Sequence, residues 1–396
     1  MYFAQHKNIT KEDQEMITKI PCISWEFEYI LRIVSLWPNT YNISIGIILW
    51  LTWITIVPFQ LIHMSEIWDN VVELMTAICD FFTEIALFLK LLIAWINRKI
   101  LMDLLIEMAD DWRESKVKST RESRLSCFVA RLDLYIYCGA IIMFFPKLLI
   151  AYFTDNPENR EFLLKTSYPF DDYKSPIYET IIILHFVQGV LMTTADLMPQ
   201  AFIVALVCHS GTQFNILHDK IERFVLIGRE YIIAEKEKKL LISEIIKKHQ
   251  KNIDFAERIE KAFSTISFIH CLCNGVAIGC SGLVFVTTND PIYIGRFSIY
   301  LVMKLVQTFV LCYAGEYLTN KSMAVANVAY ESNWYDLNTK HAKILLLIIL
   351  RAQKPLHLTA GKFAILSSGM FTIILQKRTE IGRELRKTVD EYSCET

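Results

Sequence analysis

The sequence predicts an all-α membrane protein with seven transmembrane helices and an amino terminus inside the cell. Three observations lead to this fold class. Hydrophobic residues make up 53% of the 396 residues, more than a water-soluble protein of this length usually carries. They gather in segments of about twenty residues, the length that crosses a bilayer as a helix. Lysine and arginine concentrate in alternate connections between those segments, and such a bias orients a membrane protein.

The predicted spans follow one another along most of the chain. The first, residues 41–62, contains no charged side chain. The others cover residues 71–95, 132–153, 177–208, 262–287, 297–318 and 356–376. Residues 1–40 contain no short apolar core with a cleavage-like end, so we expect a cytosolic segment there and no signal peptide.

The basic residues decide the orientation. The amino-terminal segment holds four of them, and the connections after spans two, four and six hold eight, eleven and five. The connections on the other side hold none, three and one. Because positive charge favours the cytoplasmic side, the amino terminus is predicted inside and the carboxyl terminus outside. A G-protein-coupled receptor has the opposite orientation, which makes that class a minor alternative.

The long inner connection at residues 211–261 is predicted to be helical. Apolar side chains recur there every three or four positions between glutamates and lysines, the pattern of an amphipathic helix. A solvated helical hairpin and a packed cytosolic extension of spans four and five both fit this pattern. We prefer the extension, because the apolar stripe needs a cover.

The last hydrophobic block is predicted to form two helices. About a dozen residues separate Lys343 from Lys354, too few to span a bilayer, so residues 319–354 are expected to hold a buried cytosolic helix. Its candidate caps are Asp336, Asn338 and Thr339. Pro355 ends this helix, because proline disfavours helical geometry in the residue before it. A membrane helix over residues 355–376 and a polar tail over 377–396 follow.

The second of these helices carries a polar stripe. At 100° per residue, one quarter of its circumference holds Lys362, Ile365, Gly369, Thr372 and Gln376. A cation on such a stripe suggests a water-filled path. Small and polar residues that mediate helix packing are the other explanation.

Several segments resemble a known family. The stretch AYESNWYDL, followed by LLLIILRAQKPLHLTAGKF, resembles the carboxyl-terminal signature of the insect odorant receptor family. KKHQKNIDFAERIEKAFSTISF and YAGEYLTNKS resemble its sequences around spans five and six, while TSYPFD and INRKI match more loosely. The resemblance runs from about residue 70 to 376. It implies a tuning subunit of an odorant-gated, non-selective cation channel, in the plasma membrane of a sensory neuron dendrite, that forms a heterotetramer with a co-receptor.

The resemblance also implies roles for individual residues. The polar stripe of residues 355–376 would line the pore. A cytosolic anchor between subunits would include Trp334, Tyr335, Leu345, Leu346, Ile349 and Leu350, for which ordinary core packing is the other explanation. Family members continue as an apolar helix beyond the position of Gln376, whereas this chain turns to QKRTEIGRELRKTVDEYSCET. The family's outer gate has no counterpart in that sequence.

The odorant pocket implied by the resemblance lies in the outer half of the membrane, among spans two, three, four and six. No motif fixes it, so depth and side-chain type select Leu74, Ile78, Phe81, Phe144, Leu148, Tyr152, Ile182, His185, Met303 and Gln307. A volatile apolar ligand needs a mostly hydrophobic cavity with few polar groups. Contact with lipid or a neighbouring helix is the alternative for each of them.

Two further patterns fall within the spans. Asp80 and Lys147 lie at similar predicted depth and are expected to pair, because either charge alone would be costly in the membrane. His270 and Cys273 share one helical face, as two metal ligands would, but no further ligand accompanies them. We therefore expect no metal site.

The sequence gives little support to other classes of function. No phosphate loop, nucleophile elbow or HExxH motif occurs, so neither an enzyme nor a cofactor is expected. A net charge of −1 gives no reason for a nucleic-acid partner. A transporter would show interrupted helices at matching positions of two halves, and only one interruption is present. A gustatory-type receptor is the closer alternative. The expected partners are a co-receptor, a small volatile ligand, the lipid bilayer and permeant cations.

Overall fold

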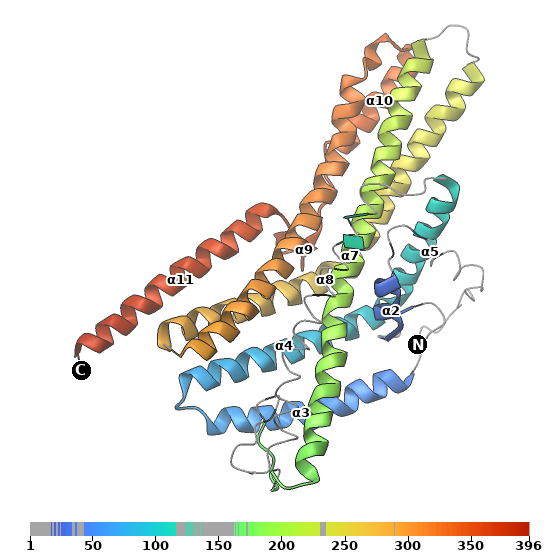
Figure 1. Cartoon of the computed structure of the whole chain (residues 1–396). Helices are drawn as coiled ribbons and strands as arrows, with labels where there is room; N and C mark the ends of the chain where they lie inside the picture. Colours follow the sequence, from blue (N-terminus) through green and yellow to red (C-terminus); the bar gives the residue numbers. More distant parts are fainter. Residues whose placement is uncertain are drawn as a thin grey trace.

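The computed structural model describes residues 25–33, 43–115, 173–229, 235–288 and 290–395, with shorter stretches and single positions between residues 17 and 37, 124 and 135, and 162 and 171. In this part of the chain nearly every element is a helix (Figure 1). The first of them is α2 (Trp25–Ile33). The predicted helical fold is therefore confirmed for these residues.

The first two long helices agree closely with the predicted spans. The helix α3 (Ile43–Glu66) corresponds to residues 41–62, and α4 (Val71–Ile96) to residues 71–95. Asn70 fixes the start of α4, because its side chain accepts a hydrogen bond from the backbone N–H of Glu73. The helix α5 (Arg98–Ser115) follows directly, and it was not predicted from the sequence.

Three very long helices form the body of the molecule. They are α7 (Ile177–Arg229), α8 (Glu235–Thr287) and α9 (Pro291–Glu331). Each joins a predicted span and a predicted inner segment in one continuous helix, and the three run together toward the end where α10 lies (Figure 1). Ile245 and Ile259 on the inner part of α8 are fully buried. The amphipathic stripe is therefore packed against the protein, as we expected, rather than solvated.

Several of the described helices have the composition of membrane spans. A stretch long and apolar enough to cross a bilayer occurs in α8 and in residues Ile294–Glu331 of α9, and Ile177–Leu191 is a shorter apolar stretch. The helix α3 has no acidic residue, lysine or arginine before Glu66. Predicted span three, residues 132–153, lies outside the described residues except for Tyr135.

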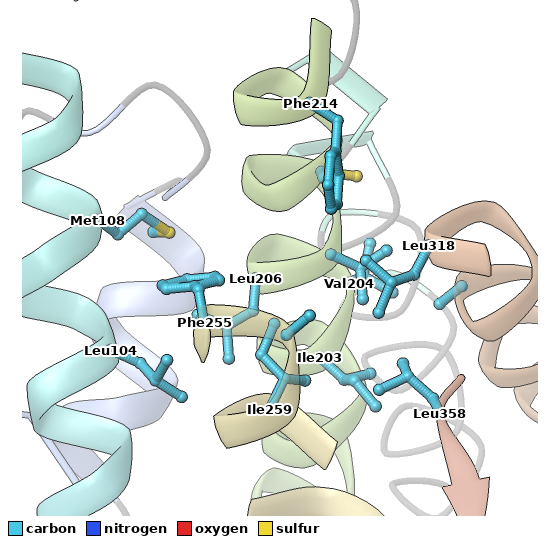
Figure 2. Packing of buried hydrophobic residues seen from close by; sticks show 14 of the residues in the cluster. Leu104, Met108, Ile203, Val204, Leu206, Phe214, Phe255, Ile259, Leu318 and Leu358 are labelled. Carbon is cyan, nitrogen blue, oxygen red and sulfur yellow. The ribbon is translucent and has the colours of Figure 1, made fainter. Parts of the chain in front are cut away.

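The main hydrophobic core lies where α5, α7, α8 and α9 meet. Figure 2 shows Leu104 and Met108 of α5 facing Phe255 and Ile259 of α8, with Leu206 of α7 beside them. On the other side of α7, Val204 faces Leu318 of α9, and Leu358 closes the cluster. This core lies where the predicted spans meet the predicted inner segments, so it packs the long helices against one another at that level.

The apolar segment ILLLIIL forms a separate helix, as predicted. A 3₁₀ turn (η2, Trp334–Asp336) precedes α10 (Thr339–Ala352). Asn338 is the amino-terminal cap, since its side chain accepts a hydrogen bond from the backbone N–H of Lys340. One of the three predicted caps is thus confirmed.

The prediction of a helix starting at residue 355 was wrong. After α10 the chain forms a small hairpin, in which β1 (Thr359–Ala360) pairs antiparallel with β2 (Ala364–Ile365). Gly361 and Lys362 in its turn both have positive φ angles, 62° and 64°, which no helix contains. Hydrogen bonds to α8 hold the hairpin. Gly361 donates its N–H to the carbonyl of Ser264, the N–H of Thr359 donates to Glu260, and the Thr359 hydroxyl contacts both Glu260 and the Ser264 hydroxyl.

We expect Gly361→Ala to weaken this hairpin. Alanine at this position would have to adopt a positive φ, which is disfavoured for residues with a side chain, and its Cβ would lie 2.9 Å from the ring of Phe268. Together these effects cost on the order of 1–3 kcal/mol. Thermal unfolding of the purified protein should therefore begin at a lower temperature. Gly369→Ala is the matched control, because its Cβ would have no neighbour nearer than 3.6 Å. Equal unfolding temperatures for the two variants would contradict this role.

The last helix is α11 (Ser368–Glu395). It begins about a dozen residues later than predicted and continues through the sequence expected to be a separate polar tail. It leaves the body of the molecule toward the carboxyl terminus (Figure 1). Its start is fixed by α9, because Glu316 accepts hydrogen bonds from the backbone N–H and the hydroxyl of Ser368.

Candidate functional site

The predicted ligand residues of α4 lie beside α8 and α9. Leu74, Ile78 and Phe81 are all half-buried. Ile78 packs against a small apolar cluster that includes Cys280 of α8 and Phe297 of α9. Of the residues chosen on α9, Met303 is half-buried and Gln307 is buried. The structure therefore brings spans two and six together with span five, which was not among the predicted pocket helices.

The predicted residues of α7 lie in an aromatic cluster near the start of that helix. Ile182 packs with Phe162 and Tyr178, and the His185 ring lies 5.8 Å from the Phe162 ring. His185 is buried, and its Nε2 is 3.2 Å from the hydroxyl of Tyr168. Tyr168 belongs to the TSYPFD segment. This cluster is mostly apolar with a few polar groups, among them the His185 ring and the Tyr168 hydroxyl, which is the composition expected of a site for a small volatile molecule.

Three predicted ligand residues cannot be compared with this arrangement. Phe144, Leu148 and Tyr152, together with Lys147, lie outside the described residues. The expected Asp80–Lys147 pair therefore stays a prediction. In the described residues, Asp80 lies 3.8 Å from Arg296 of α9.

A buried group of charged and polar side chains, which we term the central ion cluster, joins α4, α7, α8 and α9. It consists of Lys90, Asp196, His270, Asn274, Lys304, Gln307 and Thr308. Lys90 Nζ lies 2.6 Å from Asp196 Oδ1 and 2.9 Å from His270 Nδ1. Gln307 donates to Asp196 Oδ2 at 3.1 Å, and Lys304 Nζ is 3.8 Å from the same oxygen. Asn274 contacts His270 and Thr308, each at 3.0 Å.

This cluster changes the interpretation of Gln307. Its amide nitrogen contacts Asp196, and its amide oxygen accepts a hydrogen bond from Lys304 at 3.4 Å. Both ends of the amide are thus bound inside the protein. We assign Gln307 a structural contact between α7 and α9 in this conformation, and the prediction that it contacts a ligand has no support from this geometry.

Sequence reasoning did not find the central ion cluster. Lys90 and Asp196 are each 3% exposed and lie 106 positions apart in the chain. The available signal was a small set of charges inside apolar spans, since a charge in a membrane helix generally has a partner. Depth alone could not identify which charges pair. Burying such a pair is favourable only when both partners are present and hydrogen-bonded.

His270, considered above as a metal ligand, has both ring nitrogens in contact with other side chains. Its two ring nitrogens lie against Lys90 and Asn274. Within the described residues, no group of three or more histidine, cysteine, aspartate or glutamate side chains lies close enough to hold a metal ion.

The predicted anchor residues divide between two faces of α10. Leu345 and Ile349 are buried against the chain's own core. Leu346 and Leu350 point away and are 41% and 52% exposed, and Tyr335 before the helix is also exposed. Trp334 is half-buried and packs on the core. Core packing therefore accounts for one face, while the other face is an apolar surface.

The predicted pore residues do not share one helix. Lys362 and Ile365 lie in the hairpin, so their inclusion in the helical stripe was wrong. Gly369, Thr372 and Gln376 do lie on α11, three and four positions apart, and all three are exposed. Residues at this spacing occupy one helix face, so a shorter polar stripe remains.

A second charged group lies at the inner end of the core. Asp111 of α5 lies 3.3 Å from His209 Nε2 of α7 and 2.7 Å from Lys251 Nζ of α8. Burial alone would raise the pKa of Asp111, but the His209 hydrogen bond and the charges of Lys248 and Lys251 hold it well below its usual value. Glu107 and Arg258 pair beside it. These contacts stabilise the packing of the inner extensions.

We expect the inner helices to lose stability on acidification through His249. Burial first, and then the charge of Arg351, lower the pKa of His249 from 6.5 to about 4. Because the pKa of His249 is lower in the folded protein than in the unfolded chain, the neutral side chain contributes to folding stability at pH values above about 6.5. This contribution is lost as the pH falls from about 6.5 toward 4. By pH 5 the loss is about 2 kcal/mol. Chemical denaturation gives the free energy of unfolding at pH 7.5 and at pH 5. The difference between these two values should be smaller for His249→Gln than for the wild type, and identical differences would contradict the assignment.

Comparison with known proteins identifies the family. The model of the family described as 7tm Odorant receptor matches residues 70–377. Odorant receptor 13a of Drosophila melanogaster is 28% identical over 272 residues, which cover 65% of this chain and 62% of that protein. Odorant receptor 10 of Aedes albopictus is 28% identical over 208 residues, or 52% of this chain and 54% of that protein. The chain thus spans less than two thirds of the length of these curated relatives.

Solved structures agree with the fold. The insect olfactory receptor OR5 from Machilis hrabei in complex with eugenol matches with a TM-score of 0.77 and 17% identity, over 95% of this chain and 99% of that one. The structure of the same receptor described without eugenol gives a TM-score of 0.71 and 16% identity, over 91% and 96%. At this identity the likeness shows the fold alone. Because the family model covers more than half of the chain, the protein belongs to the odorant receptor family. The gustatory alternative is not favoured.

Proposed function

We propose that this chain is a tuning subunit of an odorant-gated, non-selective cation channel in the plasma membrane of sensory neuron dendrites. The observation that carries the proposal is the family match across residues 70–377, which includes α10 and the first turns of α11. Family membership supports the activity of a receptor or channel rather than that of an enzyme. The detected molecule is a small volatile compound.

The proposed topology has seven spans, with the amino terminus in the cytoplasm and the carboxyl terminus outside. The charge bias supports this orientation. The packed inner ends of α5, α7 and α8 also support it, because their charged contacts need water on one side. Asp111, Lys251 and Arg258 are among these groups. The inner extensions and α10 then form a cytosolic domain beneath the membrane.

The exposed face of α10 supports assembly with other subunits. Leu346, Leu347 and Leu350 are exposed on a helix that would otherwise lie in water, and apolar surface of this kind is typical of an interaction site. In the proposed heterotetramer a co-receptor covers this face. The exposed stripe of Gly369, Thr372 and Gln376 would face the ion path, and Lys362 and Ile365 of the hairpin would lie at its inner end.

The proposed ligand site uses the aromatic cluster on α7 and the neighbouring part of α4. Ile182 and His185 already lie together with Phe162 and Tyr168, and Leu74, Ile78, Phe81 and Met303 are partly accessible. Phe144, Leu148 and Tyr152 would complete the cavity from span three. Odorant contacts there would be mostly apolar, with His185 as the polar group.

Co-expression with the family's co-receptor tests the proposal. We expect odorants from a volatile panel to evoke inward currents that require this chain and reverse near 0 mV. The polar second half of α11 should be compared with a version in which an apolar helix replaces residues 377–396. Silence of the native version beside a responding replacement would localise the defect to that segment. If neither version responds while both reach the surface, the proposal fails.

A further inference from the structure

A small cavity adjoins the central ion cluster. Its polar lining comes from Lys90, Asp196, Gln200, Ser267 and His270, and the remaining lining side chains are apolar. The cavity measures about 20 Å³. A single water needs roughly 10–15 Å³, so the space suits one small occupant and excludes an odorant.

Among the described residues, the charges around this cavity do not balance. Lys90 and Lys304 are both buried, and among the described residues Asp196 is the carboxylate that pairs with them. Both oxygens of Asp196 are already engaged, Oδ1 by Lys90 and Oδ2 by Gln307 and Lys304. Glu84, the next acid along α4, accepts a hydrogen bond from Gln188 instead. With both lysines protonated, one positive charge remains in a region of low polarity, where an uncompensated charge is costly.

Several side chains of the cavity lining carry hydrogen-bond donors. Gln200 is buried, and its Nε2 has no hydrogen-bond partner among the residues that the structure describes. Lys90 uses two of its three ammonium donors on Asp196 and His270. The hydroxyl of Ser267 also lines the cavity. An occupant that only accepts hydrogen bonds and carries one negative charge would satisfy both the donors and the charge.

We propose that this cavity binds a small monovalent anion of the halide class, with chloride as the physiological ion. Lys90 lines the cavity and supplies positive charge, and Gln200 and Ser267 supply neutral donors. Lys304 does not line the cavity and adds positive charge beside Asp196. The anion stabilises the junction of α4, α7, α8 and α9. It binds apart from the proposed odorant site and does not depend on the proposed channel activity.

Thermal unfolding of the purified full chain in detergent tests this site without any odorant. Sodium chloride is titrated against sodium gluconate at constant ionic strength. We expect a saturable rise in Tm of about 2–4 °C in chloride, and bromide should replace chloride. Because no current is measured, the result is independent of whether the chain conducts ions.

Three variants make the test specific. Lys90→Met leaves Lys304 and Asp196 as a neutral pair, so the chloride-dependent rise should disappear. Gln200→Leu removes one neutral donor and should weaken apparent chloride affinity about tenfold. Gln60→Leu is the matched control, a buried glutamine of α3 that does not line the cavity, and it should keep the wild-type dependence. Equal Tm values of the wild type in chloride and gluconate, or an undiminished rise in both Lys90→Met and Gln200→Leu, would overturn the proposal.

Discussion

Asp196→Asn is expected to remove most of the mature receptor from the cell surface. The substitution keeps the shape of the side chain but leaves Lys90 and Lys304 without their carboxylate partner. Breaking a buried ion pair by removing one member costs about 3–5 kcal/mol, a large part of the net stability of a typical domain. Surface biotinylation and fluorescence-detected gel filtration would measure the loss, which should exceed tenfold.

Two further variants separate this effect from general sensitivity of the membrane helices. Asp80→Asn makes the same replacement of a carboxylate by an amide on α4. Because Asp80 is partly exposed and lies 3.8 Å from Arg296, the abundance of the protein at the cell surface should change little. The triple variant Lys90→Met, Asp196→Leu and Lys304→Met replaces the charges by apolar groups, and it should recover much of the abundance. A normal surface level for Asp196→Asn would contradict the account of this cluster.

The double variant Leu346→Gln and Leu350→Gln is expected to abolish the proposed assembly with a co-receptor while the single chain still folds. Both leucines are exposed on α10, so their replacement removes no contact with the chain's own core. In an interface, apolar anchors of this kind can each contribute about 2 kcal/mol or more. Affinity capture of the tagged co-receptor, with gel filtration in detergent, would report the loss.

Leu345→Ala provides the contrasting case on the same helix. Leu345 is fully buried in the core, so its truncation should destabilise the chain itself by about 2–5 kcal/mol. The two faces of α10 would thus give different defects, one in assembly and one in folding. Wild-type capture of the co-receptor by the Leu346 and Leu350 variant would show that this face is not an interface.

The sequence was most informative where a helix has a local signal. The bounds of α3 and α4 followed from apolar length, and Asn338 was identifiable as a cap from its position before ILLLIIL. The long helices α7 to α9 were predicted as separate spans and extensions. Their continuity could not be predicted from hydropathy, because that signal changes where the surroundings change from apolar to polar even when the backbone does not.

Other features depend on geometry that no local pattern specifies. The hairpin before α11 requires positive φ at both Gly361 and Lys362, and a lysine rarely indicates such a conformation. A helical projection was therefore applied to residues that are not helical. The central ion cluster depends on contacts between four helices that are distant in sequence, so Asp196 could be paired with Lys90 only from the fold.

Cysteine accessibility on α11 tests most directly whether this chain lines an ion path. Thr372 is exposed on the polar stripe of the helix, while Ile374 is half-buried two positions later. With Thr372→Cys co-expressed with the co-receptor, a positively charged thiol reagent applied during odorant stimulation should block most of the current, and Ile374→Cys should be little affected. Odorant-evoked currents that persist unchanged after modification of Thr372→Cys, with labelling verified on the protein, would contradict a pore-lining role for this subunit.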